Sequence, residues 1–295
     1  MNVRPCTMDD LESVTGLLRT METSFRGRSH FKANDLLEPW SRVSLAEDTW
    51  LFEEGSAPVA YGMCELWGDT GACFGVVAPD ARGRGLGSAL LDRLERRSAE
   101  RDAAKVHTYA FVEDEAARAL FESRGYREVR RFWEMAIELT EPPLEVPLGG
   151  GLVLEEFREG EERAFYDATV ESFQDHWNWH ATEYERWIEM RRGQHRDEHG
   201  PLWFVVRDGD ELAAVVRNEA DRNGGGYVGL IGVRRAWRGQ GLAKALLQGT
   251  FSEFWKRGTT RVTLDVDADS PTGATHLYER VGMHVEACGV VFEKT

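Results

Sequence analysis

The sequence is poor in cysteine, and no run of apolar residues is long enough to span a membrane. Its four cysteines, Cys6, Cys64, Cys73 and Cys288, form no paired motif. Neither a disulfide framework nor a zinc site is therefore predicted, and we expect reduced, mostly buried thiols. The N-terminus has no apolar core of the kind found in a signal peptide. We therefore expect a cytoplasmic protein without a membrane partner.

Positive charge is also scarce. The 295 residues include 36 Lys and Arg against 51 Asp and Glu, a net charge of -15. This balance argues against a nucleic-acid partner, because phosphate binding needs a cationic face. It is compatible with an amine-bearing substrate, although an acidic surface that keeps the protein in solution explains most of the charge. An apolar content of 42% and 10 Trp residues indicate packed globular structure.

The most informative feature that is present is an internal repeat. The segment 82–91, RGRGLGSALL, reappears as RGQGLAKALL at 238–247. Further on, the pattern A-x-x-L-F-E-x-x-G at 117–125 reappears as A-x-x-L-Y-E-x-x-G at 274–282. Two blocks that recur in the same order, this far apart, indicate two copies of a whole domain.

The two copies lie on opposite sides, in the sequence, of a segment rich in proline and glycine. Residues 140–151 hold three prolines and three glycines, a composition typical of a linker. We therefore predict a first domain over residues 1–140, a linker over 141–151 and a second domain over 152–295. In both halves the pattern predicts strands, then a strand, helix, strand, helix and strand, which is an α/β order.

The glycine segments lie between a predicted strand and a predicted helix. Glycines there let the backbone approach a ligand, and a helix N-terminus favours a phosphate group. Neither copy ends in Gly-Lys-Ser/Thr, so a P-loop is excluded. Both copies also lack the last glycine of the Gly-x-Gly-x-x-Gly dinucleotide fingerprint.

The pattern that does fit is Arg-x-x-Gly-x-Gly/Ala. It resembles the acetyl-CoA pyrophosphate loop of the GNAT superfamily of N-acetyltransferases, and the second repeated block stands at that family's usual distance. The resemblance covers nearly the whole chain. It implies two tandem GNAT domains, each an α/β (α+β) fold with a mostly antiparallel sheet splayed at its middle and flanked by helices. It also implies acetyl-CoA as acyl donor, no metal, and cofactor contacts from Val76, Val77, Arg82, Gly83, Arg84, Gly85, Leu86, Gly87 and Ser88 in the first copy and from Ile231, Gly232, Val233, Arg238, Gly239, Gln240, Gly241, Leu242, Ala243 and Lys244 in the second.

The two copies differ at one chemically important position. GNAT enzymes commonly use a tyrosine to protonate the departing thiolate, and Tyr278 stands at the matching position in the second copy. A phenol with a pKa of about 10 is protonated at neutral pH and can donate this proton. Phe121 fills the same place in the first copy without a hydroxyl. We therefore expect catalysis by Tyr278 in the second domain and a catalytically degenerate first domain. Whether the first domain binds acetyl-CoA without turnover or serves only as a scaffold is left open.

The tandem arrangement is similar to that of mycothiol synthase and related two-domain acetyltransferases, whose C-terminal domain is the active one. This chain departs from their pattern, because the strand 227–233 holds no carboxylate and residues 269–273 no asparagine. The general base is left open among Asp175, Glu219, Asp221 and a water chain. His195 and His199 have a spacing that suits a metal, but a polar loop over 193–200 is favoured.

The sequence thus predicts an acetyl-CoA-dependent N-acetyltransferase that acts by direct attack on the primary amine of a small molecule. The alternatives are a non-catalytic acyl-CoA-binding or sensor protein and a protein N-acetyltransferase. The acceptor, the acyl chain length and the oligomeric state are not predicted.

Overall fold

A computed structural model describes residues 1–144, 146–222 and 224–295. The chain divides into two compact units. Unit 1 comprises Met1–Phe132 and Ala287–Thr295, and unit 2 comprises Trp133–Glu286. The last residues of the chain therefore belong to unit 1, whereas the predicted boundaries assign them to the second domain. Residues 141–144 and 146–151 of the predicted linker form no helix or strand, and Glu145 lies outside the described residues.

Unit 1 contains a sheet flanked by helices. The strands follow the order β1 (Asn2–Arg4), β2 (Thr49–Glu54), β3 (Ala57–Trp67), β4 (Thr70–Val77), β5 (Lys105–Phe111) and β14 (His284–Lys294). All of their pairings are antiparallel except that of β4 with β5. The helices are α1 (Leu11–Arg26), α2 (Ala33–Ser41), α3 (Leu45–Asp48), α4 (Leu86–Glu100) and α5 (Glu115–Ser123), with short 3₁₀ turns at Met8–Asp10 and Pro79–Ala81.

Unit 2 repeats this plan. Its strands follow the order β6 (Arg127–Glu138), β13 (Arg261–Asp267), β12 (Gly225–Val233), β11 (Glu211–Arg222), β10 (Trp203–Asp208) and β7 (Val153–Glu156). The unit boundaries fall within two strands, since residues 127–132 of β6 belong to unit 1 and residues 284–286 of β14 to unit 2. β12 and β13 are parallel, whereas β7, β10, β11 and β12 pair antiparallel. The other elements are α6 (Glu162–Phe173), α7 (Tyr184–Arg191), α8 (Leu242–Lys256), α9 (Ala274–Arg280), a 3₁₀ turn at Arg235–Trp237, and the two short strands β8 (Arg196–Asp197) and β9 (Gly200–Pro201). The predicted fold class is confirmed.

Several elements form where the apolar pattern predicts them. Leu86, Leu90 and Leu94, spaced four residues apart, are all buried on one face of α4. In α8, Leu242, Leu246, Thr250 and Phe254 have the same spacing and are buried in the same way. The turn Asp208–Gly209–Asp210 joins β10 to β11, with Gly209 at a φ of 58°. No helix of the described residues is long and apolar enough to cross a membrane.

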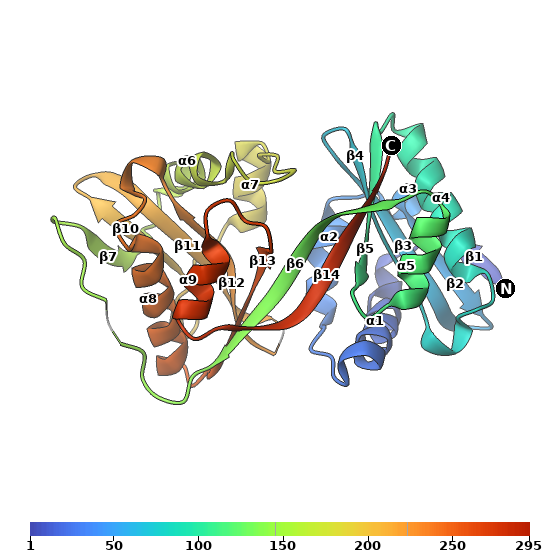
Figure 1. Ribbon diagram of the computed structural model, residues 1–295, viewed down its shortest axis with the longest axis horizontal. Helices are drawn as coiled ribbons and strands as arrows, with labels where there is room; N and C mark the ends of the chain where they lie inside the picture. The colour runs from blue at the N-terminus through green and yellow to red at the C-terminus, as the bar shows by residue number, and fades with distance from the viewer. Residues whose placement is uncertain (145, 223) are drawn as a thin grey trace. The chain divides into compact units, whose positions relative to one another are not determined.

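The main difference from the predicted element order concerns the end of the chain. β14 pairs with β5 from Gly289↔Phe111 to Lys294↔Val106, so the sixth strand of the first sheet comes from the C-terminus. Figure 1 shows this strand, drawn red, ending beside β5. Phe292 of β14 lies 5.4 Å from Phe121, measured between ring centroids, within a buried cluster of unit 1. The core of the first unit is therefore completed by residues that follow the second repeat.

Candidate functional site

In both units the two parallel strands pair at one end and then separate. β4 and β5 are paired from Thr70↔Lys105 to Ala72↔His107, and within the described part of the chain they do not pair beyond that point. β12 and β13 are paired at Gly226↔Val262 and Tyr227↔Thr263 in the same limited way. The backbone groups on the facing edges beyond these pairs can bind an extended ligand. This is the splay that the family resemblance implies.

The glycine loops have the same backbone in both units. Gly83 and Gly239 have φ values of 72° and 79°, and Gly85 and Gly241 have 79° and 81°. These left-handed conformations strain any residue with a Cβ. Gly85 and Gly241 are the N-caps of α4 and α8. The unpaired N–H groups of the first helical turn, together with the helix dipole, give each loop the properties of an anion site.

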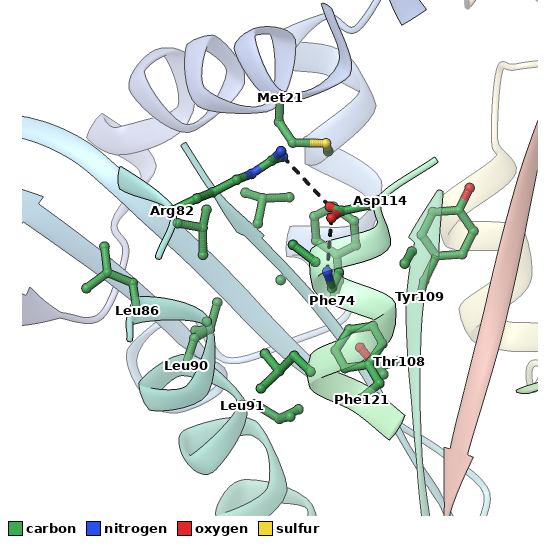
Figure 2. A pocket seen from close by; sticks show the side chains of 18 of the residues that line it. Met21, Phe74, Arg82, Leu86, Leu90, Leu91, Thr108, Tyr109, Asp114 and Phe121 are labelled. Atoms are coloured by element: carbon green, nitrogen blue, oxygen red, sulfur yellow. Dashed lines mark hydrogen bonds and ion pairs between the residues drawn. The ribbon is translucent and has the colours of Figure 1, made fainter. Parts of the chain in front are cut away.

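A cavity of about 480 Å³ occupies the separation between the strands in unit 1. Figure 2 shows Leu86, Leu90 and Leu91 of α4 and Phe121 of α5 directed toward it. Its lining includes eight of the nine residues that the resemblance assigns to the first copy, namely Val76, Val77, Arg82, Gly83, Gly85, Leu86, Gly87 and Ser88. The ninth, Arg84, directs its guanidinium to Glu54 instead. The structure thus brings almost the whole first set together.

Arg82, the first residue of the loop pattern, is held at the cavity by two residues that the sequence did not single out. Its guanidinium lies 3.7 Å from the carboxylate of Asp114 and 4.6 Å from the ring centroid of Phe25. Asp114 also caps α5 by accepting a hydrogen bond of 3.0 Å from the N–H of Ala117. An Asp just before a helical pattern is a recognisable N-cap signal, so Asp114 could have been predicted from the sequence as the cap of this helix.

These features fit a ligand with a phosphate group and a long apolar arm. The arginine and the helix N-terminus lie at the loop, whereas most of the remaining lining is apolar, and the volume is typical of small-molecule sites. A CoA thioester has both parts. When bound, it supplies an acyl group activated for transfer.

The loop of unit 2 is held by contacts of its own. Arg238 donates hydrogen bonds of 3.2 Å to the carbonyl oxygens of Val233 and Ser172. Asp175 accepts a bond of 2.5 Å from Arg235 and lies 3.8 Å from Arg238. The bond from Arg235 lowers the pKa of Asp175, which makes its carboxylate a weaker base. Asp175 is thus an anchor of the loop.

The other second-copy residues vary in exposure. Gly232 is buried where β12 passes close to α6, since a Cβ there would lie 2.8 Å from that of Ser172. Leu242 belongs to the core of unit 2, and Ile231, Val233 and Ala243 are half-buried. The remaining loop residues are exposed, namely Arg238, Gly239, Gln240, Gly241 and Lys244.

β12 has an irregularity that β4 lacks. Leu230 pairs with Arg217 and Val228 pairs with Asn218, so Gly229 is an extra residue, a β-bulge. The corresponding ladder in unit 1 is unbroken from Ala60↔Val77 to Trp67↔Thr70. A bulge leaves its extra residue out of the ladder and locally redirects the strand, and such features are common beside active sites.

A polar cluster faces this bulge. A Cβ on Gly229 would lie 3.1 Å from Oε1 of Glu219 and 3.2 Å from Nη2 of Arg217. Glu219 forms ion pairs with Arg217 at 3.2 Å and with Arg222 at 3.5 Å. Of the base candidates left open by the sequence, Glu219 is therefore the one that lies at the bulge, whereas Asp221 is exposed on the same strand.

Tyr227 stands opposite Glu219 in the ladder. Its buried hydroxyl donates a hydrogen bond of 2.8 Å to Oδ2 of Asp265, and the guanidinium of Arg222 lies 4.3 Å from its ring centroid. Burial, with the negative charge of Asp265, raises the pKa of Tyr227 well above its ordinary value. No sequence motif pointed to this tyrosine–carboxylate pair, because its members lie on two strands that only the fold brings together.

Tyr278 lies on α9 with 6% of its surface exposed. Among the described residues its hydroxyl has no hydrogen-bond partner. Burial raises its pKa above that of a free phenol, so the hydroxyl keeps its proton at neutral pH. Phe121, at the matching repeat position, lines the cavity of unit 1. The repeat therefore relates Tyr278 to a position that faces a cofactor-type cavity.

The two histidines of the metal alternative have different surroundings. His195 packs its ring 5.6 Å from that of Phe157, whereas His199 is exposed. No cluster of three or more His, Cys, Asp or Glu side chains suited to a metal occurs in the described parts of the chain. The predicted loop over 193–200 contains β8 and the start of β9, so that part of the prediction was wrong.

Comparison with known proteins agrees with this geometry. Residues 14–126 and 156–283 each match the Acetyltransferase (GNAT) family. A mycothiol acetyltransferase of Cellulomonas flavigena is 28% identical over 74% of this chain and 65% of its own length, and one of Salinispora tropica is 32% identical over 70% and 67%.

Two solved structures also match. A GCN5-related N-acetyltransferase from Sphaerobacter thermophilus is 31% identical, with a TM-score of 0.85 over 99% of this chain and 95% of that one. A tandem GNAT protein from the clavulanic acid biosynthesis pathway shares the fold, with a TM-score of 0.75 at 16% identity over 99% and 98% of the two chains. With both halves matching the family model and splayed strands in both units, the chain belongs to the GNAT family of acetyltransferases and carries two copies of its domain.

Proposed function

We propose that unit 2 transfers an acetyl group from acetyl-CoA to the primary amine of a small molecule by direct attack. The observation that carries this proposal is Tyr278, a residue with 6% of its surface exposed, at the repeat position where unit 1 has Phe121. The bulge at Gly229, present in β12 and not in β4, supports the same assignment. Family membership supports the acetyl-CoA donor.

Three groups of unit 2 have the chemistry that acyl transfer needs. Tyr278 holds a proton at its hydroxyl and delivers it to the leaving sulfur. The backbone N–H groups at the bulge stabilise negative charge on the thioester oxygen. Glu219 accepts the proton of the attacking amine. Its position at the bulge supports this role, and its ion pairs with Arg217 and Arg222 hold it there.

The first unit binds acetyl-CoA without turnover. Its cavity, loop and splayed strands supply the groups for binding. Phe121 supplies no proton, and the unbroken β3–β4 ladder leaves no bulge for an oxyanion. The alternative of a non-catalytic acyl-CoA-binding protein therefore applies to unit 1 alone.

A small-molecule acceptor is supported by the similarity to proteins named mycothiol acetyltransferases.

The test exchanges the two aromatic residues. In the Tyr278→Phe variant we expect kcat to fall by about 10²–10⁴-fold, the usual contribution of a positioned general acid, with the KM for acetyl-CoA nearly unchanged. Phe121→Tyr serves as the matched control and should leave kcat unaltered. Release of CoA is measured with a panel of small amines. Wild-type turnover in Tyr278→Phe removes the role assigned to this hydroxyl.

A further inference from the structure

Two of the four cysteines lie directly opposite each other. Cys64 of β3 and Cys73 of β4 are Cα partners in the antiparallel ladder, and 1% and 5% of their surfaces are exposed. Both sulfurs lie 3.4 Å from the hydroxyl oxygen of Ser98 on α4. The side chains therefore point to the same face of the sheet and meet under the same helix.

This pair is located at the point where β4 leaves β5. The last pair between the two strands is Ala72↔His107, so Cys73 is the first residue of the separated part. The next four residues, Phe74 to Val77, all line the cavity of unit 1. Leu94, whose carbonyl lies 3.8 Å from the Cys73 sulfur, lines it too. A displacement at Cys73 is thus passed directly to the cavity wall.

The surroundings favour one reactive sulfur. Hydrogen bonds with Cys73 and Ser98 lower the pKa of the Cys64 thiol, whereas the hydrogen bond with Cys64 and burial raise the pKa of the Cys73 thiol. A thiolate is the nucleophile in disulfide exchange. Cys64 is thus the attacking group and Cys73 the resolving one.

We propose that Cys64 and Cys73 form a reversible disulfide that weakens ligand binding in the cavity of unit 1. The oxidant is a low-molecular-weight disulfide. The thiolate of Cys64 attacks one of its sulfurs, which forms a mixed disulfide and releases one small thiolate. Cys73, on losing its proton, then attacks the sulfur of Cys64 and releases the second. The protein loses two hydrogen atoms, and the oxidant leaves as two thiols once protonated.

The direction of the effect follows from strand geometry. Directly opposite residues of antiparallel strands have Cβ atoms about 4.5–5.5 Å apart, whereas a disulfide needs about 3.5–4.5 Å. Closing the bridge therefore draws β4 toward β3 at Cys73 and away from β5. The separation between β4 and β5 widens, so contacts across the cavity are lost. The consequence for binding rests on the proposed acetyl-CoA site of unit 1, but the disulfide itself does not.

The experiment oxidises the full-length protein with hydroxyethyl disulfide and measures two independent quantities. Intact mass should fall by two hydrogen atoms and recover with a reductant. Digestion at acidic residues cleaves at Glu65 and Asp69, so a bridged peptide pair identifies the two cysteines. Cys64→Ser and Cys73→Ser should each abolish the bridge, whereas Cys6→Ser and Cys288→Ser should leave it unchanged.

CoA binding is measured by calorimetry in the Gly241→Glu background, which confines binding to unit 1. We expect the Kd to rise severalfold on oxidation and to return on reduction. Absence of the bridged pair, or its formation without change in Kd, overturns the proposal. If the reduced protein binds no CoA in this background, the proposed role of unit 1 fails and its control by redox state with it, while the mass measurement still decides whether the disulfide forms.

Discussion

The two units have the same loop backbone and the same splayed strands, yet they differ beside those shared parts. Unit 1 has a lined cavity, an unbroken β3–β4 ladder and Phe121. Unit 2 has the bulge at Gly229, a polar cluster facing it and the hydroxyl of Tyr278. The features that the two units share are those that a cofactor needs for binding, and the features that differ are those that a thioester needs for reaction. Under the proposed function, glycine loops and splayed strands serve binding, whereas the hydroxyl of Tyr278 and the extra residue Gly229 serve chemistry.

The largest expected effect comes from breaking the loops one at a time. In Gly241→Glu a side chain is forced into a left-handed conformation, and a negative charge is placed at the helix N-terminus. We expect kcat/KM to fall by about 10³-fold, from the loss of anion binding. The same change at Gly85 should lower kcat/KM much less, because the reaction is proposed for unit 2. Steady-state kinetics checks both variants, and equal losses would show that both units catalyse.

The second prediction concerns the strand that the C-terminus contributes. Phe292→Ala empties a fully buried position beside Phe121 and should destabilise unit 1 by about 3–5 kcal/mol. Hydrogen exchange should accelerate in β5 and leave β10 and β11 unaffected. Val285→Ala, at an exposed position on the same strand, is the control. Faster exchange in β10 and β11 in place of β5 would contradict the assignment of this strand to unit 1.

The third prediction separates two carboxylates of unit 2. Glu219→Gln should lower kcat/KM for the amine by about 10–100-fold, because the residue at the bulge can no longer accept a proton. Asp175→Asn should mainly raise the KM for acetyl-CoA, since Asp175 is paired with the loop arginines. The reverse pattern would make Asp175 the base. Kinetics with each substrate varied in turn distinguishes the two.

The smallest expected effect is that kcat does not change as the pH rises into the alkaline range. Burial raises the pKa of Tyr278, so the protonated form persists as the pH increases through the range where a free phenol ionises. We therefore expect no alkaline loss of kcat from this residue below about pH 10. An alkaline limb near pH 9 that disappears in Tyr278→Phe would show that the phenol is less shielded than its burial indicates. A pH profile of both proteins checks this.

Much of the fold was predictable because it depends on local patterns. The leucines of α4 and the Asp208–Gly209–Asp210 turn form as their spacing and backbone needs dictate. Helix α7, by contrast, was not predicted, because none of its residues is buried and its apolar pattern is weak. The C-terminal strand itself was predicted, but its pairing within unit 1 was missed. Its partner β5 is far away in sequence, and no local signal encodes that pairing.

The candidate site also has parts that could be predicted from the sequence and parts that could not. The loops and the difference between Phe121 and Tyr278 could be predicted from the sequence, because each lies in a short motif and the repeat shows which positions correspond. Glu219 could only be one of several carboxylates, since its position at Gly229 follows from strand register. Register also brings Tyr227 to Asp265. Sequence spacing carries no information on such cross-strand neighbours.

The sequence by itself determined the duplication, the two glycine loops and the difference between Phe121 and Tyr278, because these reside in contiguous segments whose backbone and chemistry are local. Only the tertiary structure decided which sheet the last strand completes, where β12 bulges, and that two cysteines nine positions apart lie opposite each other. Each of these depends on strand pairing, in which a shift of one residue turns every side chain to the other face. The register of each strand is therefore determined by the packing of the whole sheet.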